Sequence, residues 1–110
     1  MVVLMDGHCK GSYMVKRAPD FLRAVLDQDG ETDLLDLVKD IPKATEKIYV
    51  YKLVPDTRGI VHLDARGKDG KKITGWYAIG EYKHIPEIEG EQFRDNLKWQ
   101  DWVRSQYGAK

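Results

Sequence analysis

The sequence predicts an α+β domain built around a three-stranded antiparallel meander over about residues 46–85. The first predicted strand, EKIYVYKLV, is rich in the β-branched and aromatic residues that strands favour. The other two, IVHLDAR and ITGWYAIGEYKHI, flank Asp69-Gly70, a dipeptide typical of tight hairpin turns. Because 110 residues suffice for one hydrophobic core, we expect a single domain spanning residues 1–110.

A two-residue type I′ turn at Asp69-Gly70 would fix the register of this hairpin. Pairing of Lys68 with Lys71 then places Leu63 opposite Trp76. The first strand of the meander has apolar residues on both of its faces. We therefore expect the sheet to be covered in part on both faces, by helices, by the N-terminal strands or by a second subunit.

Two short helices are predicted before the meander, over residues 18–28 and 32–39. Apolar residues recur at helical spacing in the first, and Pro19 suits a first helical turn, where its missing N–H costs nothing. Thr32 is a suitable N-cap for the second, and Pro42 stops it. Both helices are expected to pack on the sheet.

The two ends of the chain are predicted to add strands and a helix. Val2–Met5 and Tyr13–Arg17 have the short apolar runs of strands, and the N-terminal one can extend the sheet. Residues 91–106 are expected to form a helix packed on the meander. On an ideal helical wheel Trp102 lies away from the apolar side, so either the helix is broken near 96–98 or Trp102 is exposed.

Composition limits the classes of function. The 18 basic and 18 acidic side chains give a net charge of zero, which argues against a protein that binds polyanions with its whole surface. A single cysteine cannot form an internal disulfide and fits a reducing compartment, so we expect a cytoplasmic protein. The N-terminal apolar run is too short for a signal sequence or a membrane span, and no membrane association is expected.

The one cysteine, Cys9, follows His8 directly, which raises the question of a catalytic thiol. Neighbouring side chains on an extended chain point to opposite faces, so His8 is poorly placed to act as the base for Cys9. His62 or His84 could serve instead. The alternative is that Cys9 is a small, partly buried hydrophobic residue at the start of a strand.

No metal site or cofactor is predicted. Cys9, His8, His62 and His84 have none of the spacings typical of metal ligands. Residues 27–33 carry four carboxylates but lack EF-hand spacing, so we expect an acidic connection between the two helices. The phosphate-binding, dinucleotide-binding and nucleophile-elbow motifs are absent from the sequence.

The leading functional prediction is a non-enzymatic protein that binds a protein partner or a second copy of itself. It rests on the missing catalytic motifs, on a sheet that is apolar on both faces, and on a pair of tryptophans. Tryptophan is enriched among interface anchors. The candidate contact residues are Trp99, Trp102, Tyr49 and Tyr51. The alternative role for the two tryptophans is to close the sheet as core residues.

Two other functions stay open. The first is nucleic-acid binding by the basic 66–72 hairpin, with aromatic residues of the sheet stacking on bases. Its candidate residues are Arg58, Arg66, Lys68, Lys71 and Lys72. Lysines at a hairpin tip also protect sheet edges from aggregation, which is the structural alternative. The second is a small thiol-dependent enzyme that uses Cys9.

Overall fold

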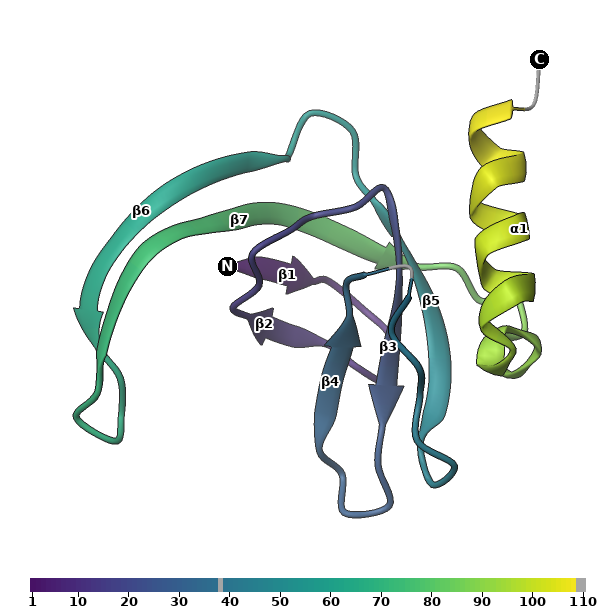
Figure 1. The fold of residues 1–110 in the computed structure, drawn as a ribbon, viewed down its shortest axis with the longest axis horizontal. Helices are drawn as coiled ribbons and strands as arrows, with labels where there is room; N and C mark the ends of the chain where they lie inside the picture. Colours follow the sequence, from purple (N-terminus) through teal and green to yellow (C-terminus); the bar gives the residue numbers. More distant parts are fainter. Residues whose placement is uncertain (38, 109–110) are drawn as a thin grey trace.

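The computed structural model describes residues 1–37 and 39–108 and shows a sheet-rich fold with one C-terminal α-helix (Figure 1). The strands are β1 (Val2–Leu4), β2 (Gly11–Tyr13), β3 (Phe21–Leu26), β4 (Thr32–Leu35), β5 (Lys47–Leu53), β6 (Gly59–Arg66) and β7 (Lys72–His84). A 3₁₀ helix η1 (Gly90–Arg94) and the helix α1 (Asn96–Gly108) follow them.

The strands form one mixed sheet that curls into a nearly closed barrel. Six of them follow the order β2-β1-β7-β5-β3-β4, and β6 pairs with β7 outside this path. The β1–β7 pair is parallel and the other pairs are antiparallel. β7 organises the fold because it pairs with β1 at residues 80–82, with β5 at 82–84 and with β6 at 72–79.

The predicted three-stranded meander is wrong. β5 and β6 do not pair with each other, because both are bound to β7 at different points along it. The chain changes direction between them at Pro55 and at Asp56, whose φ of 66° breaks the extended conformation. The expected N-terminal strand is present as β1, but it lies parallel to β7. The sheet is therefore a mixed barrel rather than an antiparallel meander.

The two predicted helices at 18–28 and 32–39 are also wrong, because these segments contain the strands β3 and β4. Val38, inside the second predicted helix, lies outside the described residues. β3 is buried on both faces: Leu22 and Ala24 belong to the barrel interior, whereas Phe21 and Arg23 contact the C-terminal segment. A strand buried on both faces is a continuous apolar run, and such a run also fits helical spacing.

A three-residue turn joins β3 to β4 and replaces the expected link between helices. The N–H of Asp27 donates to the carbonyl of Glu31 at 2.8 Å, and the N–H of Gly30 donates to that of Asp27 at 3.0 Å. Gly30 has a φ of 81°, the left-handed conformation that glycine adopts without strain. The acidic segment 27–33 is thus a hairpin turn with its flanking strand residues.

The predicted C-terminal helix is interrupted. Asp95 is extended, with φ −76° and ψ 113°, and separates η1 from α1. Its carboxylate accepts the N–H of Leu97 at 2.9 Å and so caps α1. The break falls one residue before the expected 96–98, and it turns Trp102 inward to a half-buried position.

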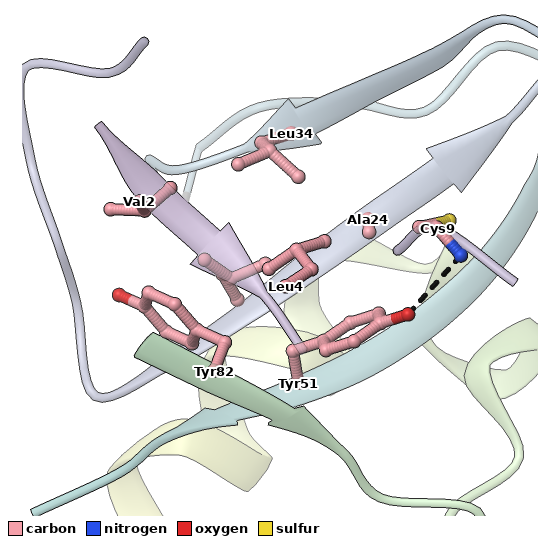
Figure 2. Close-up of a cluster of buried hydrophobic side chains, with 8 residues drawn as sticks. Val2, Leu4, Cys9, Ala24, Leu34, Tyr51 and Tyr82 are labelled. Atoms are coloured by element: carbon pink, nitrogen blue, oxygen red, sulfur yellow. Dashed lines mark hydrogen bonds between the residues drawn. The ribbon is translucent and has the colours of Figure 1, made fainter. Parts of the chain in front are cut away.

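The barrel interior is one of two hydrophobic clusters (Figure 2). Its buried members are Val2, Leu4, Cys9, Leu22, Ala24, Leu34, Tyr51 and Tyr82. The second cluster lies outside the barrel, where Phe93 of η1 and Trp99 of α1 cover Val50 of β5. The C-terminal helix therefore closes an outer face of the sheet, while residues 1–9 close the interior.

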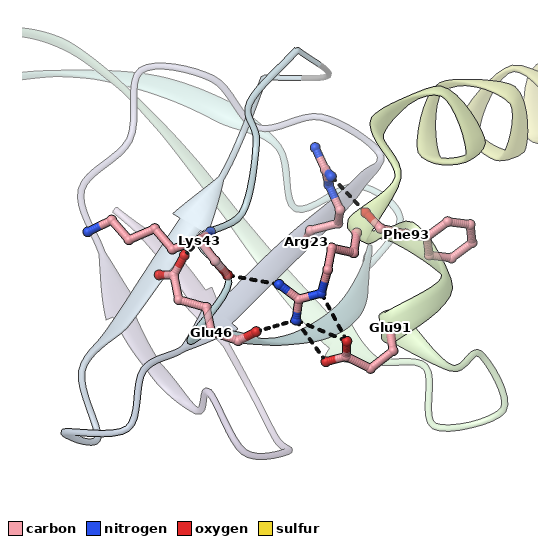
Figure 3. Close-up of polar contacts among 6 residues, drawn as sticks. Arg23, Lys43, Glu46, Glu91 and Phe93 are labelled. Atoms are coloured by element: carbon pink, nitrogen blue, oxygen red, sulfur yellow. Dashed lines mark hydrogen bonds and ion pairs between the residues drawn. The ribbon is translucent and has the colours of Figure 1, made fainter.

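Two arginines attach the C-terminal segment to the barrel (Figure 3). Arg23 of β3, which is fully buried, donates to the carbonyl of Phe93 at 2.9 Å. Arg94 donates to the carbonyls of Lys43 at 2.8 Å and Glu46 at 2.6 Å. Each guanidinium carries several donors in a fixed planar arrangement, which suits it to bridge separate segments of backbone.

Candidate interaction arm

The hairpin of β6 and the first part of β7 extends from the barrel as an arm, defined here as residues 59–79. Figure 1 shows it curving away on the side of the molecule opposite α1. Along the arm β6 pairs only with β7, and no other described helix or strand makes extensive contact with it. Eight residues of strand give β6 a length of roughly 26 Å.

The turn at the tip has three residues, and the predicted type I′ register is wrong by one position. The N–H of Gly67 donates to the carbonyl of Lys71 at 2.8 Å, and Gly70 has a φ of 78°. Trp76 consequently pairs with His62 instead of Leu63. A one-residue shift moves each side chain of one strand to the opposite face relative to the other strand.

One face of the arm carries an exposed aromatic and aliphatic strip. Trp76 is 64% exposed and Ile60 is 70% exposed. The rings of Trp76 and His62 meet edge to face, with their centroids 5.1 Å apart. Ile60 pairs with Ala78, the next position toward the barrel on the same face. The strip therefore continues from the middle of the arm to its base.

The opposite face of the arm is also apolar. Its half-buried side chains are Val61, Leu63, Ile73, Tyr77 and Ile79. The ammonium group of Lys16 lies 3.7 Å from the centre of the Tyr77 ring and donates to the carbonyl of Trp76 at 3.3 Å. These apolar side chains cover one another across the hairpin, and no third layer of described secondary structure lies over them.

The basic residues predicted for nucleic-acid binding separate into two places. Arg66, Lys68, Lys71 and Lys72 are exposed at the tip of the arm, where Lys72 lies 3.9 Å from the Asp64 carboxylate. Arg58 lies instead at the base of the arm and forms an ion pair with Asp20. The tip thus provides four cations in one place, and Arg58 is not among them.

The residues predicted as partner contacts lie mainly in the two clusters. Trp99 is 1% exposed and Tyr51 is fully buried. Trp102 is half-buried and stacks on Trp99 with ring centroids 5.4 Å apart. Tyr49 is half-buried and stacks on His8 at 4.7 Å. As folded, these four side chains offer little surface to a partner.

Cys9 is held in the barrel interior by hydrogen bonds of its backbone. Its N–H donates to the hydroxyl oxygen of Tyr51 at 3.2 Å, and its carbonyl accepts the Tyr13 hydroxyl at 2.6 Å (Figure 2 draws the first bond). Burial raises the pKa of the Cys9 thiol to about 11. A thiol that stays protonated at neutral pH lacks the activation that a catalytic cysteine needs.

The histidines are not brought together around this thiol as metal ligands. His84 lies beside the two tyrosines of β5, with ring centroids 5.8 Å from Tyr49 and 5.3 Å from Tyr51. His62 is on the arm. Within residues 1–37 and 39–108 no group of three or more histidine, cysteine, aspartate or glutamate side chains is placed to hold a metal ion.

A cavity of about 410 Å³ lies at the base of the arm. The arm and its approach contribute Arg58, Gly59, Ile60 and Ala78, and the barrel contributes residues 16–19 with Asp36 and Leu37. Sequence reasoning did not find this cavity, because its walls come from four separate stretches of the chain, and two of these lie in segments that were predicted as helices.

No family model, curated protein or solved structure matches the chain. Among the described helices, none has the length and apolar character needed to cross a membrane.

The exposed strip on the arm was also missed at the sequence level. The alternation of apolar and polar residues in β6 and β7 correctly predicts strands, but it does not say what covers each face. In the predicted meander Trp76 would lie within the sheet, with β5 beside β6. In the structure β5 pairs with β7 only at residues 82–84. Trp76 therefore lies in the part of β7 that pairs with β6 alone, beyond the barrel.

Proposed function

We propose that this chain is a non-enzymatic binding protein that contacts a protein partner, or a second copy of itself, through the β6–β7 arm. The observation that carries the proposal is an arm with apolar side chains on both faces, over which no third layer of described helices or strands lies. An isolated two-stranded hairpin is marginally stable in water, so covering its apolar faces with a partner is favourable.

Trp76 and Ile60 are the expected anchors of this contact. Trp76 is a large aromatic residue that is 64% exposed, in a chain whose other two tryptophans belong to α1 and pack against the outer face of the barrel. Tryptophan dominates many interfaces because it buries a large area while keeping a polar N–H. Its place in the middle of the arm, beside His62, leaves room for a partner on both sides.

Charge on the arm favours an acidic partner surface. Residues 59–79 contain four basic and two acidic side chains, a net charge of +2, so the rest of this neutral chain carries −2. Complementary charge speeds the encounter of two surfaces and favours one orientation over others. A second copy of the chain would supply the balancing negative charge.

The test compares the arm with an equally exposed residue elsewhere. Trp76→Ser and Ile60→Ser should weaken self-association, measured by sedimentation velocity over a range of concentrations, by about 30-fold for the tryptophan. Leu97→Ser is the matched control, since Leu97 is 70% exposed on α1, far along the chain from the arm.

A partner other than a second copy is tested by photocrosslinking. A benzophenone amino acid placed at position 76 should give discrete adducts in a host lysate, whereas the same group at position 97 should not. If the chain stays monomeric and the adducts at the two positions are the same, the arm is not an interaction site.

Nucleic-acid binding is the second candidate, and the clustering of Arg66, Lys68, Lys71 and Lys72 at the tip supports it. Arg66 and Lys72 pair on the face that carries Trp76, which would let phosphates and a base be contacted together. A labelled single-stranded oligonucleotide should then bind with an affinity that falls steeply with salt. Reversing the charges of Lys68, Lys71 and Lys72 should abolish that binding. Salt-insensitive anisotropy, or none, would exclude this candidate.

A further inference from the structure

The cavity at the base of the arm has the size and the lining of a small-molecule site. Its volume of about 410 Å³ lies within the range of roughly 300–1,000 Å³ that is typical of ligand pockets. The apolar residues of its wall are Ala18, Pro19, Leu37, Ile60 and Ala78. Of these, Ala78 is buried and Ile60 is exposed, so an apolar ligand would cover side chains that now face water.

Cations predominate among the charged residues of the wall. Lys16, Arg17 and Arg58 line the cavity, and Asp36 is the one carboxylate among its lining residues. Arg58 is already paired with Asp20, and Lys16 donates to the Trp76 carbonyl. The guanidinium of Arg17 faces the charge of Asp36, whose pKa is raised by burial and lowered in part by Arg17. Among the described residues no hydrogen bond to the Arg17 guanidinium is present, so its donors can also hold the carboxylate of a ligand.

We propose that this cavity binds a small organic anion with an apolar body, such as a medium-chain carboxylate. The apolar body lies against the alanine, proline, leucine and isoleucine side chains, and the carboxylate accepts hydrogen bonds from Arg17. An arginine holds a carboxylate through two parallel N–H···O bonds, which fixes the orientation of the ligand as well as its charge.

Binding at this site also connects the arm to the barrel. Ile60 and Ala78 belong to the arm, whereas Pro19 and Leu37 belong to the loops that precede β3 and follow β4. A ligand between them touches both parts at once and restricts how the arm leaves the barrel. The ligand site does not require the arm to bind a protein. The proposed ligand and the proposed protein contact can therefore each be disproved without the other.

The first experiment titrates the ¹⁵N-labelled full chain with octanoate and, separately, with 1-octanol. Octanoate should shift the amide signals of Ala18, Leu37, Ile60 and Ala78 in a saturable manner, and 1-octanol should bind about tenfold more weakly because it lacks the charge. Shifts confined to other regions, the absence of saturable shifts, or equal affinity for the alcohol would overturn the proposal.

The second experiment tests the anchor and the cavity separately. Arg17→Glu should weaken octanoate binding about tenfold or more, whereas Arg104→Glu, the same charge change at an exposed position of α1, should not alter it. Ala18→Leu, which fills the cavity, should weaken octanoate and 1-octanol alike, with the dispersion of the amide spectrum checking the fold. If neither Arg17→Glu nor Ala18→Leu changes the affinity for octanoate, the proposed site is wrong.

Discussion

Arg23 donates a hydrogen bond from its Nη1 to the carbonyl oxygen of Phe93, 2.9 Å away and 70 residues later in the chain. The same guanidinium donates to the carbonyl of Asp40 at 2.6 Å and to Oδ1 of Asn96 at 3.0 Å. It also lies over the Trp99 ring, 5.0 Å from its centre. One buried side chain thus connects β3, the segment before β5, and the start of α1.

Replacement of this arginine should destabilise the whole fold. Arg23→Met keeps most of the side-chain volume but leaves one buried and two partly buried acceptors without their donor, so we expect the free energy of unfolding to fall by about 3 kcal/mol. Urea unfolding followed by tryptophan fluorescence measures the change. Arg104→Met, at a side chain that is 75% exposed, should change it by less than about 0.5 kcal/mol. Equal losses in the two variants would contradict the assigned role.

Trp102 should act on stability and not on association. Its ring packs against Phe21 at 4.9 Å and Phe93 at 5.3 Å between centroids. Trp102→Ala is expected to cost about 2–3 kcal/mol, somewhat less than the loss of a fully buried tryptophan. Leu97→Ala, on the same helix, is the control and should cost little. A drop in oligomeric state without a drop in melting temperature would instead make Trp102 a contact residue.

Gly90 should tolerate no side chain. A Cβ atom at this position would lie 1.9 Å from the carbonyl oxygen of Ile48, so Gly90→Ala must push η1 away from β5. We expect a loss of several kcal/mol, of the size seen for severe overpacking. Gly30→Ala is an instructive comparison, because Gly30 has open space around it and only its φ of 81° disfavours alanine. About 1 kcal/mol is expected there, and thermal unfolding of both variants ranks the two effects.

Stability should decline at alkaline pH because buried groups keep their protons in the folded state. Burial raises the pKa of Cys9 to about 11 and that of Tyr51 to about 12. The unfolded chain loses these protons first, so the stabilisation is complete below the unfolded pKa values and is lost as pH rises through about 9 to 12. Cys9→Ala should flatten the dependence of unfolding free energy on pH between about 9 and 11. An unchanged slope would show that the thiol does not contribute.

An Asp-Gly dipeptide marks a hairpin turn at two places in this chain, and only one of the two turns was predicted. Asp69-Gly70 correctly indicated a hairpin, and Asp29-Gly30 forms a turn with the same pattern of hydrogen bonds. The second was missed because FLRAVL is apolar on both faces and fits a helix as well as a strand. A glycine in the left-handed conformation closes both turns, so the dipeptide was the better guide.

The arrangement of strands was beyond the reach of local pattern. The sequences of β5 and β6 do not predict that both strands pair with β7. That pairing depends on which strand edges remain unpaired once the barrel has formed. The same limit applies to the candidate site. The basic tip could be read from Lys68, Lys71 and Lys72, whereas the exposure of Trp76 follows from where β5 ends.

β7 pairs with the barrel strands β1 and β5 only at its C-terminal end. Its 13 residues form a single strand of roughly 43 Å, held at 80–84 by β1 and β5 and carrying the arm tip at the other end. The same strand therefore carries both the exposed tip and the hydrogen bonds that close the barrel. Within this strand Gly75 alone has a positive φ, 134°, a conformation that favours glycine, and it lies next to Trp76. A partner bound at Trp76, as proposed above, would contact β7 directly beside this glycine.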